Sequence, residues 1–417
     1  MLTFRQLYKS KLLSNICNQF ILYGFSGIVP ILLIPFLLNV IGVEKYGLIN
    51  FCLVFSFYFQ VFNEFGFDLS NVRHVVNNRE NPEKLGRIVS SILQAKIFLV
   101  FCSFIVFYFI VISIPSFRKE LILYSLAYFR IIGIAIAPYW FFRSMEDLKY
   151  ITRISIPVKF LCVLPIFFIV QTKGDYYLVM MCYMLETIVS SIVAIIIAKK
   201  KYKIKFQIVT IKEIKYYLKD SVPFFSSTFF MRVYTNMNTL ILGFFVGDFA
   251  VGLYTAAEKL YNAYSSFISP ILYQILYPYF TRIKDIKRTT KIVLGICVIN
   301  IVIVLLLYIL SPHIIPIFIK AEASNIISYF NFFLILLAIS VPVDMIGFPF
   351  LGVLNKIDAV NKTTIFSAII YFICILFLIL FNSIDVNSVI LALIIANSTC
   401  LFSRLYIINK FKLVQKA

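Results

Sequence analysis

Residues 291–311 read KIVLGICVINIVIVLLLYILS, and after Lys291 this stretch contains no charged side chain. A helix of this length is roughly 30 Å long, which matches the thickness of the hydrocarbon core of a bilayer. The stretch therefore predicts a transmembrane helix.

The rest of the chain has the same apolar character. Of its 417 residues, 61% are hydrophobic and 14% are charged, and the mean hydropathy is +0.93. Soluble proteins average about 45–50% apolar and about 25% charged residues, and a soluble domain of this size could not bury such a surplus of apolar surface. The composition therefore predicts an integral membrane protein with roughly a dozen helical spans.

Further apolar segments lie on both sides of residues 291–311, separated by short polar breaks. Each is long enough to cross a bilayer with some tilt. The expected fold is an all-α membrane protein with about 12 transmembrane helices. We predict these helices at 14–40, 46–66, 88–114, 120–142, 150–171, 176–198, 221–246, 251–280, 291–311, 326–352, 363–381 and 387–408.

The basic residues indicate the orientation of these helices. Twelve spans place both termini on one side, and that side, with its loops and adjoining helix ends, contains 29 Lys and Arg residues. Because basic residues accumulate in cytoplasmic loops, we expect both termini in the cytoplasm. The net charge of +20 then reflects loops that face anionic lipid, not a nucleic-acid partner. The opposite loops contain only five basic residues, Lys45, Arg118, Lys119, Lys173 and Lys320.

The longest basic break, KKKYKIKFQIVTIKEIKYYLKD at residues 199–220, leaves six predicted helices on each side. We therefore predict an N-terminal six-helix lobe at 1–205 and a C-terminal six-helix lobe at 206–417. A short repeat supports this division, because Gly42-x4-Gly47-Leu48 follows the first helix and Gly247-x4-Gly252-Leu253 follows the seventh. Parallel repeats of this kind are related by a pseudo-two-fold axis along the membrane normal, with a transport substrate bound between them.

Ionisable side chains in the middle of predicted spans are the main functional signal. Such groups are costly in lipid, so they usually face a bundle interior or a water-filled cavity. Cations outnumber acids among them, which predicts an interior with net positive charge. The cations are Lys96, Arg130, Lys159, Arg232 and Lys259, and the acids are Glu186, Glu258 and Asp344.

Arg130 and Arg232 lie near the middle of the fourth and seventh predicted helices. A guanidinium group donates two parallel hydrogen bonds to a phosphate and stays charged at any working pH. These residues therefore predict a cavity that attracts an anionic headgroup. A structural ion pair with Glu186 or Asp344 is the alternative interpretation.

Glu186 and Asp344 are candidates for binding a coupling ion. Asp344 ends the sequence Val341-Pro342-Val343-Asp344, where the proline leaves a backbone carbonyl without its helical partner. Broken helices of this kind can coordinate Na⁺ or H⁺. A simple proline kink beside a hydrogen-bonded Asp344 is the alternative, since proline is common in membrane helices.

Motifs for catalysis are absent from the sequence. There is no P-loop, no Gly-x-Gly-x-x-Gly and no His-Glu-x-x-His. The two histidines, His74 and His313, lie too far apart for joint acid–base chemistry. The eight cysteines have no metal-binding or redox spacing. We expect no enzymatic activity, no cofactor and no metal site.

Four stretches contain distinctive patterns, and in them the chain resembles the O-antigen unit flippases. These are the Wzx-type polysaccharide transporters of the multidrug/oligosaccharidyl-lipid/polysaccharide exporter superfamily. The Trp140 pattern is the most specific and contains the only tryptophan. Glu64 replaces the usual aspartate, and Arg143-Ser144 replaces the usual Gln-Gly. The stretches are Pro35-Phe36-Leu37 to Gly42 with Tyr46-Gly47-Leu48; Glu64-Phe65-Gly66-Phe67 to Arg73; Pro138-x-Trp140-Phe141-Phe142 to Glu146; and Gly252-Leu253-Tyr254 with Ala257-Glu258-Lys259.

This resemblance implies a transport function. Such a protein would flip an undecaprenyl-diphosphate-linked oligosaccharide from the cytoplasmic to the periplasmic leaflet of a bacterial inner membrane, by alternating access between two lobes. The product would enter O-antigen, and hence lipopolysaccharide, or capsular polysaccharide. Membrane lipids, a polysaccharide polymerase and a chain-length regulator are further candidate partners. A positive interior fits the diphosphate independently, because a bare charge is unstable in a low-dielectric slab.

The expected substrate site contains Arg130, Arg232, Lys96 and Lys259 in the cavity and Arg73 at its cytoplasmic mouth. Ordinary positive charge in cytoplasmic loops explains Arg73 equally well.

Three other functions remain open. An ion-coupled multidrug exporter of the same superfamily would favour an acidic pocket for cationic drugs, and a lipid II flippase would serve cell-wall synthesis. A membrane-embedded polysaccharide polymerase or ligase would need a large periplasmic loop, whereas every predicted outer loop is short.

Overall fold

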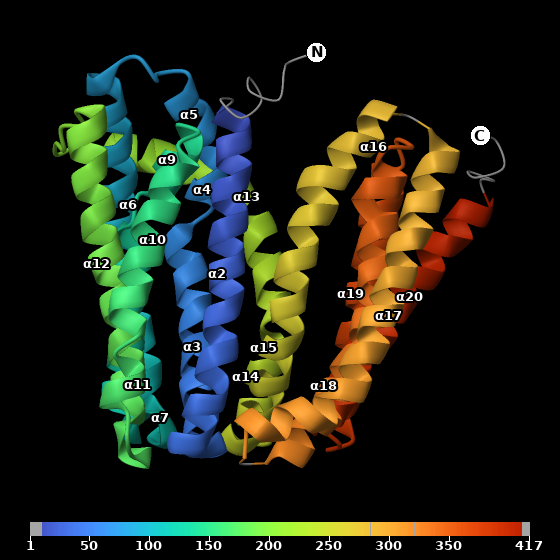
Figure 1. Cartoon of the computed structure of the whole chain (residues 1–417). Helices are drawn as coiled ribbons and strands as arrows, with labels where there is room; N and C mark the ends of the chain where they lie inside the picture. The colour runs from blue at the N-terminus through green and yellow to red at the C-terminus, as the bar shows by residue number, and fades with distance from the viewer. Residues whose placement is uncertain (1–10, 284, 321, 411–417) are drawn as a thin grey trace. The chain divides into compact units, whose positions relative to one another are not determined.

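The computed structural model of the chain describes residues 11–283, 285–320 and 322–410, and in these ranges its regular structure is helical (Figure 1). Residues 1–10 and 411–417, which contain the two termini predicted to be cytoplasmic, lie outside the described residues. Each of the twelve predicted spans coincides with one or more helices. The helices are α2 (Lys11–Val40), α3 (Gly42–Glu64), α4 (Phe67–Ser70), α5 (Val72–Val76), α6 (Pro82–Ser113), α7 (Pro115–Lys119), α8 (Leu121–Ile136), α9 (Tyr139–Ser144), α10 (Leu148–Val163), α11 (Ile166–Ile169), η1 (Lys173–Asp175), α12 (Tyr176–Tyr202), α13 (Ile211–Thr235), α14 (Met237–Phe245), α15 (Asp248–Pro270), η2 (Ile271–Leu276), α16 (Tyr277–Ile283), α17 (Ile286–Phe318), α18 (Ala323–Met345), η3 (Ile346–Gly352), α19 (Ile357–Leu380) and α20 (Val386–Lys410).

Within the described residues, nine helical segments are long and apolar enough to cross a membrane. The other three predicted spans, at 14–40, 221–246 and 251–280, are also helical. Charged side chains lower the hydropathy of α13 and α15, and the described part of α2 contains the shorter apolar helix Gly27–Val40. The chain is therefore a multi-pass membrane protein.

By contacts, the chain divides into two compact units. Unit 1 contains residues 1–25 and 48–240, and unit 2 contains residues 26–47 and 241–417. The borders fall inside α2, α3 and α14. The lobes at 1–205 and 206–417 stay a prediction.

The basic break packs along α6 within unit 1. The side-chain amide of Gln94 donates to the carbonyl of Gln207 at 2.8 Å, and the Gln207 amide donates to the Ser90 hydroxyl at 3.1 Å. A Cβ atom on Gly86 would lie 2.8 Å from the Lys205 carbonyl oxygen, so a larger residue would push this segment away. The segment between α12 and α13 is therefore tied to the helix that carries Lys96.

The core of unit 1 includes the motif around the single tryptophan. Helix α12 packs against α8 and α10, and α6 packs against α8 and α13. Pro138 separates α8 from α9, because proline has no N–H to continue the helical hydrogen bonds. Trp140, Phe141 and Phe142 on α9 are all buried. Their burial holds α9 in place and thereby sets the position of Arg143.

Unit 2 contains a broken helix. Helix α18 packs against α15, α17 and α20. It ends at Met345 and continues as the π-helical segment η3, in which Gly347 has a non-helical ψ of −121°. Segments of π-helix are frequent at functional sites. The break follows directly after Asp344.

The two copies of the glycine repeat meet in unit 2. Gly42 and Gly247 have positive φ angles of 82° and 112°, in the region that favours glycine. A Cβ on Gly47 would lie 1.7 Å from the carbonyl oxygen of Asp248, and a Cβ on Gly252 would lie 2.2 Å from that of Val43. The starts of α3 and α15 therefore contact each other backbone to backbone, as small residues allow in membrane proteins.

Candidate functional site

Four charged side chains from four other elements of unit 1 gather around Lys96 of α6. Arg232 Nη1 on α13 lies 2.5 Å from Glu64 Oε2 at the end of α3, and Arg143 Nη1 on α9 lies 2.8 Å from Asp68 Oδ2 on α4. Glu64, Asp68 and Arg143 also interact electrostatically with Lys96. We call these five residues the α6 cluster. Three cations against two acids leave it with one excess positive charge.

A sharp turn after α3 brings this cluster together. Phe65 and Gly66 have φ angles of 45° and 70°, so the chain changes direction immediately after Glu64. A Cβ on Gly66 would lie 2.6 Å from the backbone nitrogen of Phe225, and glycine therefore lets α13 pack closely against the turn. This packing places Arg232 against Glu64, 168 residues away in sequence.

Lys96 is the least exposed and least compensated cation of the α6 cluster. Its exposed fraction is 3%, and among the described residues its ammonium group has no hydrogen bond and no carboxylate oxygen within 4 Å. A cavity of about 10 Å³ beside it, lined also by Pro138 and Trp140, has room for about one water molecule. Since the cluster's acids pair with Arg143 and Arg232, Lys96 has no carboxylate partner of its own among the described residues.

A second group of charges, which we call the α8 triad, consists of Arg130 on α8, Lys159 on α10 and Glu186 on α12. Glu186 interacts electrostatically with both cations, but in the described part of the chain neither forms an ion pair with it within 4 Å. The predicted alternative, an ion pair of Arg130 with Glu186, is thus a longer-range interaction in this structure. The triad also has one excess positive charge.

Arg73 forms an exposed ion pair near the start of α13. Its guanidinium contacts the carboxylate of Asp220, to which His74 Nε2 also lies close at 3.0 Å. Arg87 contacts Glu213 in the same way, and that hydrogen bond lowers the pKa of Glu213 below its usual value. Both arginines therefore fasten α13 to the neighbouring helices of unit 1.

In unit 2, Lys259 on α15 interacts with a tyrosine. Its Nζ atom lies 3.1 Å from the hydroxyl of Tyr46 and 5.0 Å from the centre of that ring. The adjacent Glu258 accepts a hydrogen bond from Tyr254 at 3.0 Å. The two neighbouring charges therefore have different partners, as expected for consecutive helical residues.

Asp344 lies beside a buried arginine, Arg404, which is one of the 29 basic residues expected on the cytoplasmic side. Arg404 of α20 is 5% exposed and donates to the carbonyl of Val343. It also donates to the hydroxyls of Thr363 at 3.2 Å and Thr364 at 3.0 Å. Asp344 interacts electrostatically with Arg404. The guanidinium thus binds a carbonyl beside the helix break. In the sequence, the position of Arg404 inside the predicted helix 387–408 was the feature that could have indicated a buried arginine.

Sequence similarity to known proteins shows the family of this chain. Residues 12–284 match the family described as polysaccharide biosynthesis protein. A protein of Escherichia coli (strain K12) named "Putative O-antigen transporter" is 26% identical over 287 residues, which cover 69% of each chain. A Shigella dysenteriae protein of the same name is 23% identical over 302 residues, covering 68% of this chain and 73% of that one.

Two solved structures show the same fold. One is the lipid II flippase MurJ in an inward closed conformation, with a TM-score of 0.70 and 16% identity over 92% of this chain and 86% of that one. The other is an inward-facing multidrug resistance MATE family transporter of the MOP superfamily, with a TM-score of 0.60 and 13% identity over 94% and 99% of the two chains. Together the comparisons confirm the predicted resemblance and the all-α membrane fold of about 12 transmembrane helices in two lobes.

Proposed function

The chain belongs to the family of polysaccharide biosynthesis proteins, and we propose that it flips undecaprenyl-diphosphate-linked oligosaccharide repeat units across a bacterial inner membrane. Transport would run from the cytoplasmic to the periplasmic leaflet by alternating access, with both termini in the cytoplasm. The units would be used for O-antigen or capsular polysaccharide, by a polymerase and a chain-length regulator. The names of the two curated relatives support this assignment.

The burial of Lys96 without a paired carboxylate is the observation that carries the proposal. A buried charge is destabilising by several kcal/mol unless it is paired. A protein that keeps such a cation, with the neighbouring acids already paired, is organised to bind an anion. A diphosphate headgroup has the charge that would compensate Lys96, and arginine and lysine are the residues that bind phosphate.

The α8 triad provides a second positive site for the same headgroup. Arg130 and Lys159 are each free of an ion pair within 4 Å among the described residues, and Glu186 limits their joint charge to one excess positive unit. A moderate excess of positive charge favours binding of the anionic headgroup and still permits its release. Arg73 and Lys259 remain proposed contacts along the route, and Glu186 and Asp344 remain proposed sites for a coupling ion.

The charge balance of the α6 cluster predicts a reversal between single and double variants. In Arg232→Gln, the released Glu64 carboxylate compensates Lys96, so we expect surface polysaccharide to fall by about tenfold or more. In the double variant Glu64→Gln/Arg232→Gln, the excess positive charge returns, and we expect much of the polysaccharide to return with it. The measurement is surface polysaccharide in a deletion strain that expresses each variant, normalised to membrane abundance.

The same series contains its own control. Glu64→Gln alone raises the excess charge and should leave Arg232 able to bind substrate. Two results would show that transport does not depend on this charge balance. One is a normal amount of surface polysaccharide in Arg232→Gln, and the other is a double variant with no more polysaccharide than Arg232→Gln.

A lipid II flippase is the second candidate, favoured by the fold likeness to MurJ. It predicts that deletion is lethal in a strain without another lipid II flippase. A viable deletion strain that lacks only surface polysaccharide would exclude it.

A further inference from the structure

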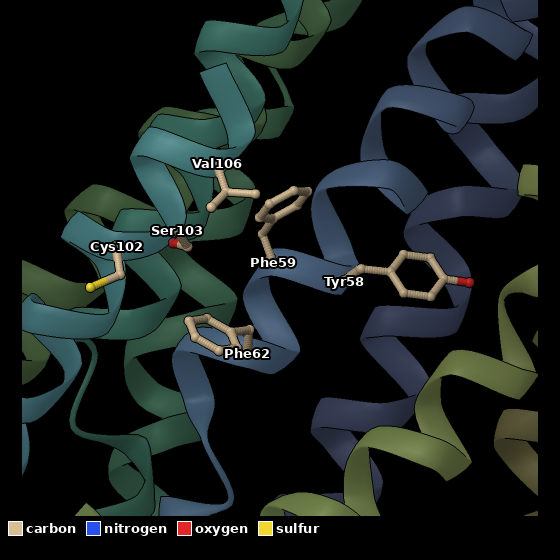
Figure 2. Close-up of a pocket in the computed structure, with 6 residues that line it drawn as sticks. All are labelled: Tyr58, Phe59, Phe62, Cys102, Ser103 and Val106. Atoms are coloured by element: carbon tan, nitrogen blue, oxygen red, sulfur yellow. The ribbon is translucent and has the colours of Figure 1, made fainter. Parts of the chain in front are cut away.

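A cavity of about 260 Å³ lies between α3 and α6 in unit 1 (Figure 2). Figure 2 shows the rings of Phe59 and Phe62 on α3 directed toward the α6 side of the cavity, whereas the ring of Tyr58 points to the other side of α3. The lining residues are Tyr58, Phe59, Phe62, Cys102, Ser103 and Val106.

The cavity offers a ligand only apolar surface. Its hydroxyl on the α6 side, that of Ser103, donates to Asn63 Oδ1 at 2.8 Å and lies 2.7 Å from the hydroxyl of the buried Tyr128. The remaining surface consists of aromatic rings, a thiol and the Val106 side chain. The occupant that fits such a lining is a hydrocarbon chain.

Apolar side chains of α6 next to the cavity are largely exposed. Val106 is 51% exposed, and the neighbouring apolar side chains of Phe101, Ile105 and Phe109 are 62%, 56% and 72% exposed. In a membrane-spanning helix such a face contacts lipid. A 150 Å³ cavity holds one benzene molecule, so 260 Å³ accommodates about ten carbon atoms, or about two isoprene units.

The two helices that form the cavity also contribute to the α6 cluster. Lys96 and Ser103 are both buried and lie seven residues apart, which is two turns or roughly 10 Å along one face of α6. On α3, Phe62 precedes Glu64 by two residues. A ligand with its phosphate at Lys96 would therefore reach the cavity with the first part of its tail.

We propose that this cavity binds the first isoprene units of the carrier lipid while its phosphate contacts Lys96. The proposal rests on the proposed function and adds to it a site for the lipid tail. Lys96 lies eight residues, or roughly 12 Å, beyond residue 88, where the predicted span begins. A phospholipid keeps its headgroup at the membrane surface, whereas a transported lipid brings its phosphate to this depth and its tail to the cavity.

Photocrosslinking in proteoliposomes tests this assignment. The probe is undecaprenyl phosphate with a diazirine in its first isoprene units, in vesicles of phosphatidylethanolamine and phosphatidylglycerol. We expect crosslinks to peptides that contain residues 58–62 and 102–106, and we expect unlabelled undecaprenyl phosphate, but not added phosphatidylglycerol, to compete. Val106→Trp should reduce these crosslinks by about tenfold by filling the cavity. Ile105→Trp, an adjacent and similarly exposed position outside the lining, should leave them unchanged.

Each result has one meaning. Specific, competed crosslinks elsewhere in the chain, with none at these two segments, would overturn the cavity assignment and leave the transport proposal standing. Equal labelling by a diazirine-bearing phosphatidylglycerol, or equal loss in both tryptophan variants, would also overturn it. If wild-type protein gave no competed crosslink at any position, the proposed substrate would fail together with the cavity.

Discussion

Replacing Lys96 with methionine should strongly reduce transport and, at the same time, make the protein more stable. Methionine has a similar length but no charge, so it removes a buried cation that is 3% exposed and has no carboxylate within 4 Å among the described residues. Replacing buried charges with well-packed apolar residues commonly stabilises a protein by about 1–4 kcal/mol. Loss of one charge-assisted contact to phosphate, worth about 1.5–3 kcal/mol, should reduce transport by at least about tenfold.

Two measurements check this result. Surface polysaccharide in a complemented deletion strain reports transport, and the thermal unfolding midpoint in detergent reports stability. Lys84→Met is the matched control, because Lys84 is exposed at the start of the same helix and should change neither quantity. A Lys96→Met protein that still assembles polysaccharide, or that unfolds at a lower temperature, would contradict the role assigned to Lys96.

Substituting alanine for Gly47 or Gly252 should deplete the folded protein from the membrane. The added methyl group would lie 1.7 Å or 2.2 Å from a backbone carbonyl oxygen, and backbone cannot rotate away as a side chain can. Overpacking in a well-packed interior is typically destabilising by about 1–3 kcal/mol, and these contacts are closer than usual. We therefore expect a loss at or above that range, seen as reduced membrane abundance and a lower unfolding midpoint.

Gly295 provides the control for this prediction. It also lies in a membrane-spanning helix, α17, but an added Cβ there would have no neighbour within 4 Å. Gly295→Ala should therefore preserve abundance, since alanine is also the better helix former. Normal abundance of Gly47→Ala and Gly252→Ala would show that the starts of α3 and α15 are not held together at these glycines.

The repeated glycines show how far a local pattern can be read. The sequence predicted a repeat from Gly42-x4-Gly47 and Gly247-x4-Gly252, and the structure adds that each copy packs against the other. A spacing in the chain indicates that two segments are similar. It does not indicate that they touch, because contact depends on how the intervening helices pack.

The sequence also did not predict which residues pair with the charged side chains inside the spans. Arg232 was expected to pair, if at all, with Glu186 or Asp344, yet it pairs with Glu64. Arg143 was noted only as a departure from a motif, and it pairs with Asp68. Such contacts arise where a turn, a helix end and a third helix converge, and no periodicity in the chain records that convergence.

Arg404 is another residue whose contacts the sequence did not predict. Position near the end of a span favoured a cytoplasmic side chain, but the guanidinium of Arg404 is buried and binds the carbonyl of Val343, just before the break in α18. That carbonyl also accepts a hydrogen bond from the backbone of Ile346. The contact follows from the packing of α20 beside α18, which the sequence does not record.

By itself, the sequence determined that the chain crosses a membrane many times, where its helices lie, and that its interior has excess positive charge. These properties depend on the number and order of apolar and charged residues, and transfer from water to lipid acts on each segment almost independently. Only the tertiary structure decided which charges pair with an opposite charge and which, like Lys96, have no carboxylate within 4 Å among the described residues. Compensation depends on distances of a few ångströms between residues up to 168 positions apart, and those distances exist only after the helices have packed.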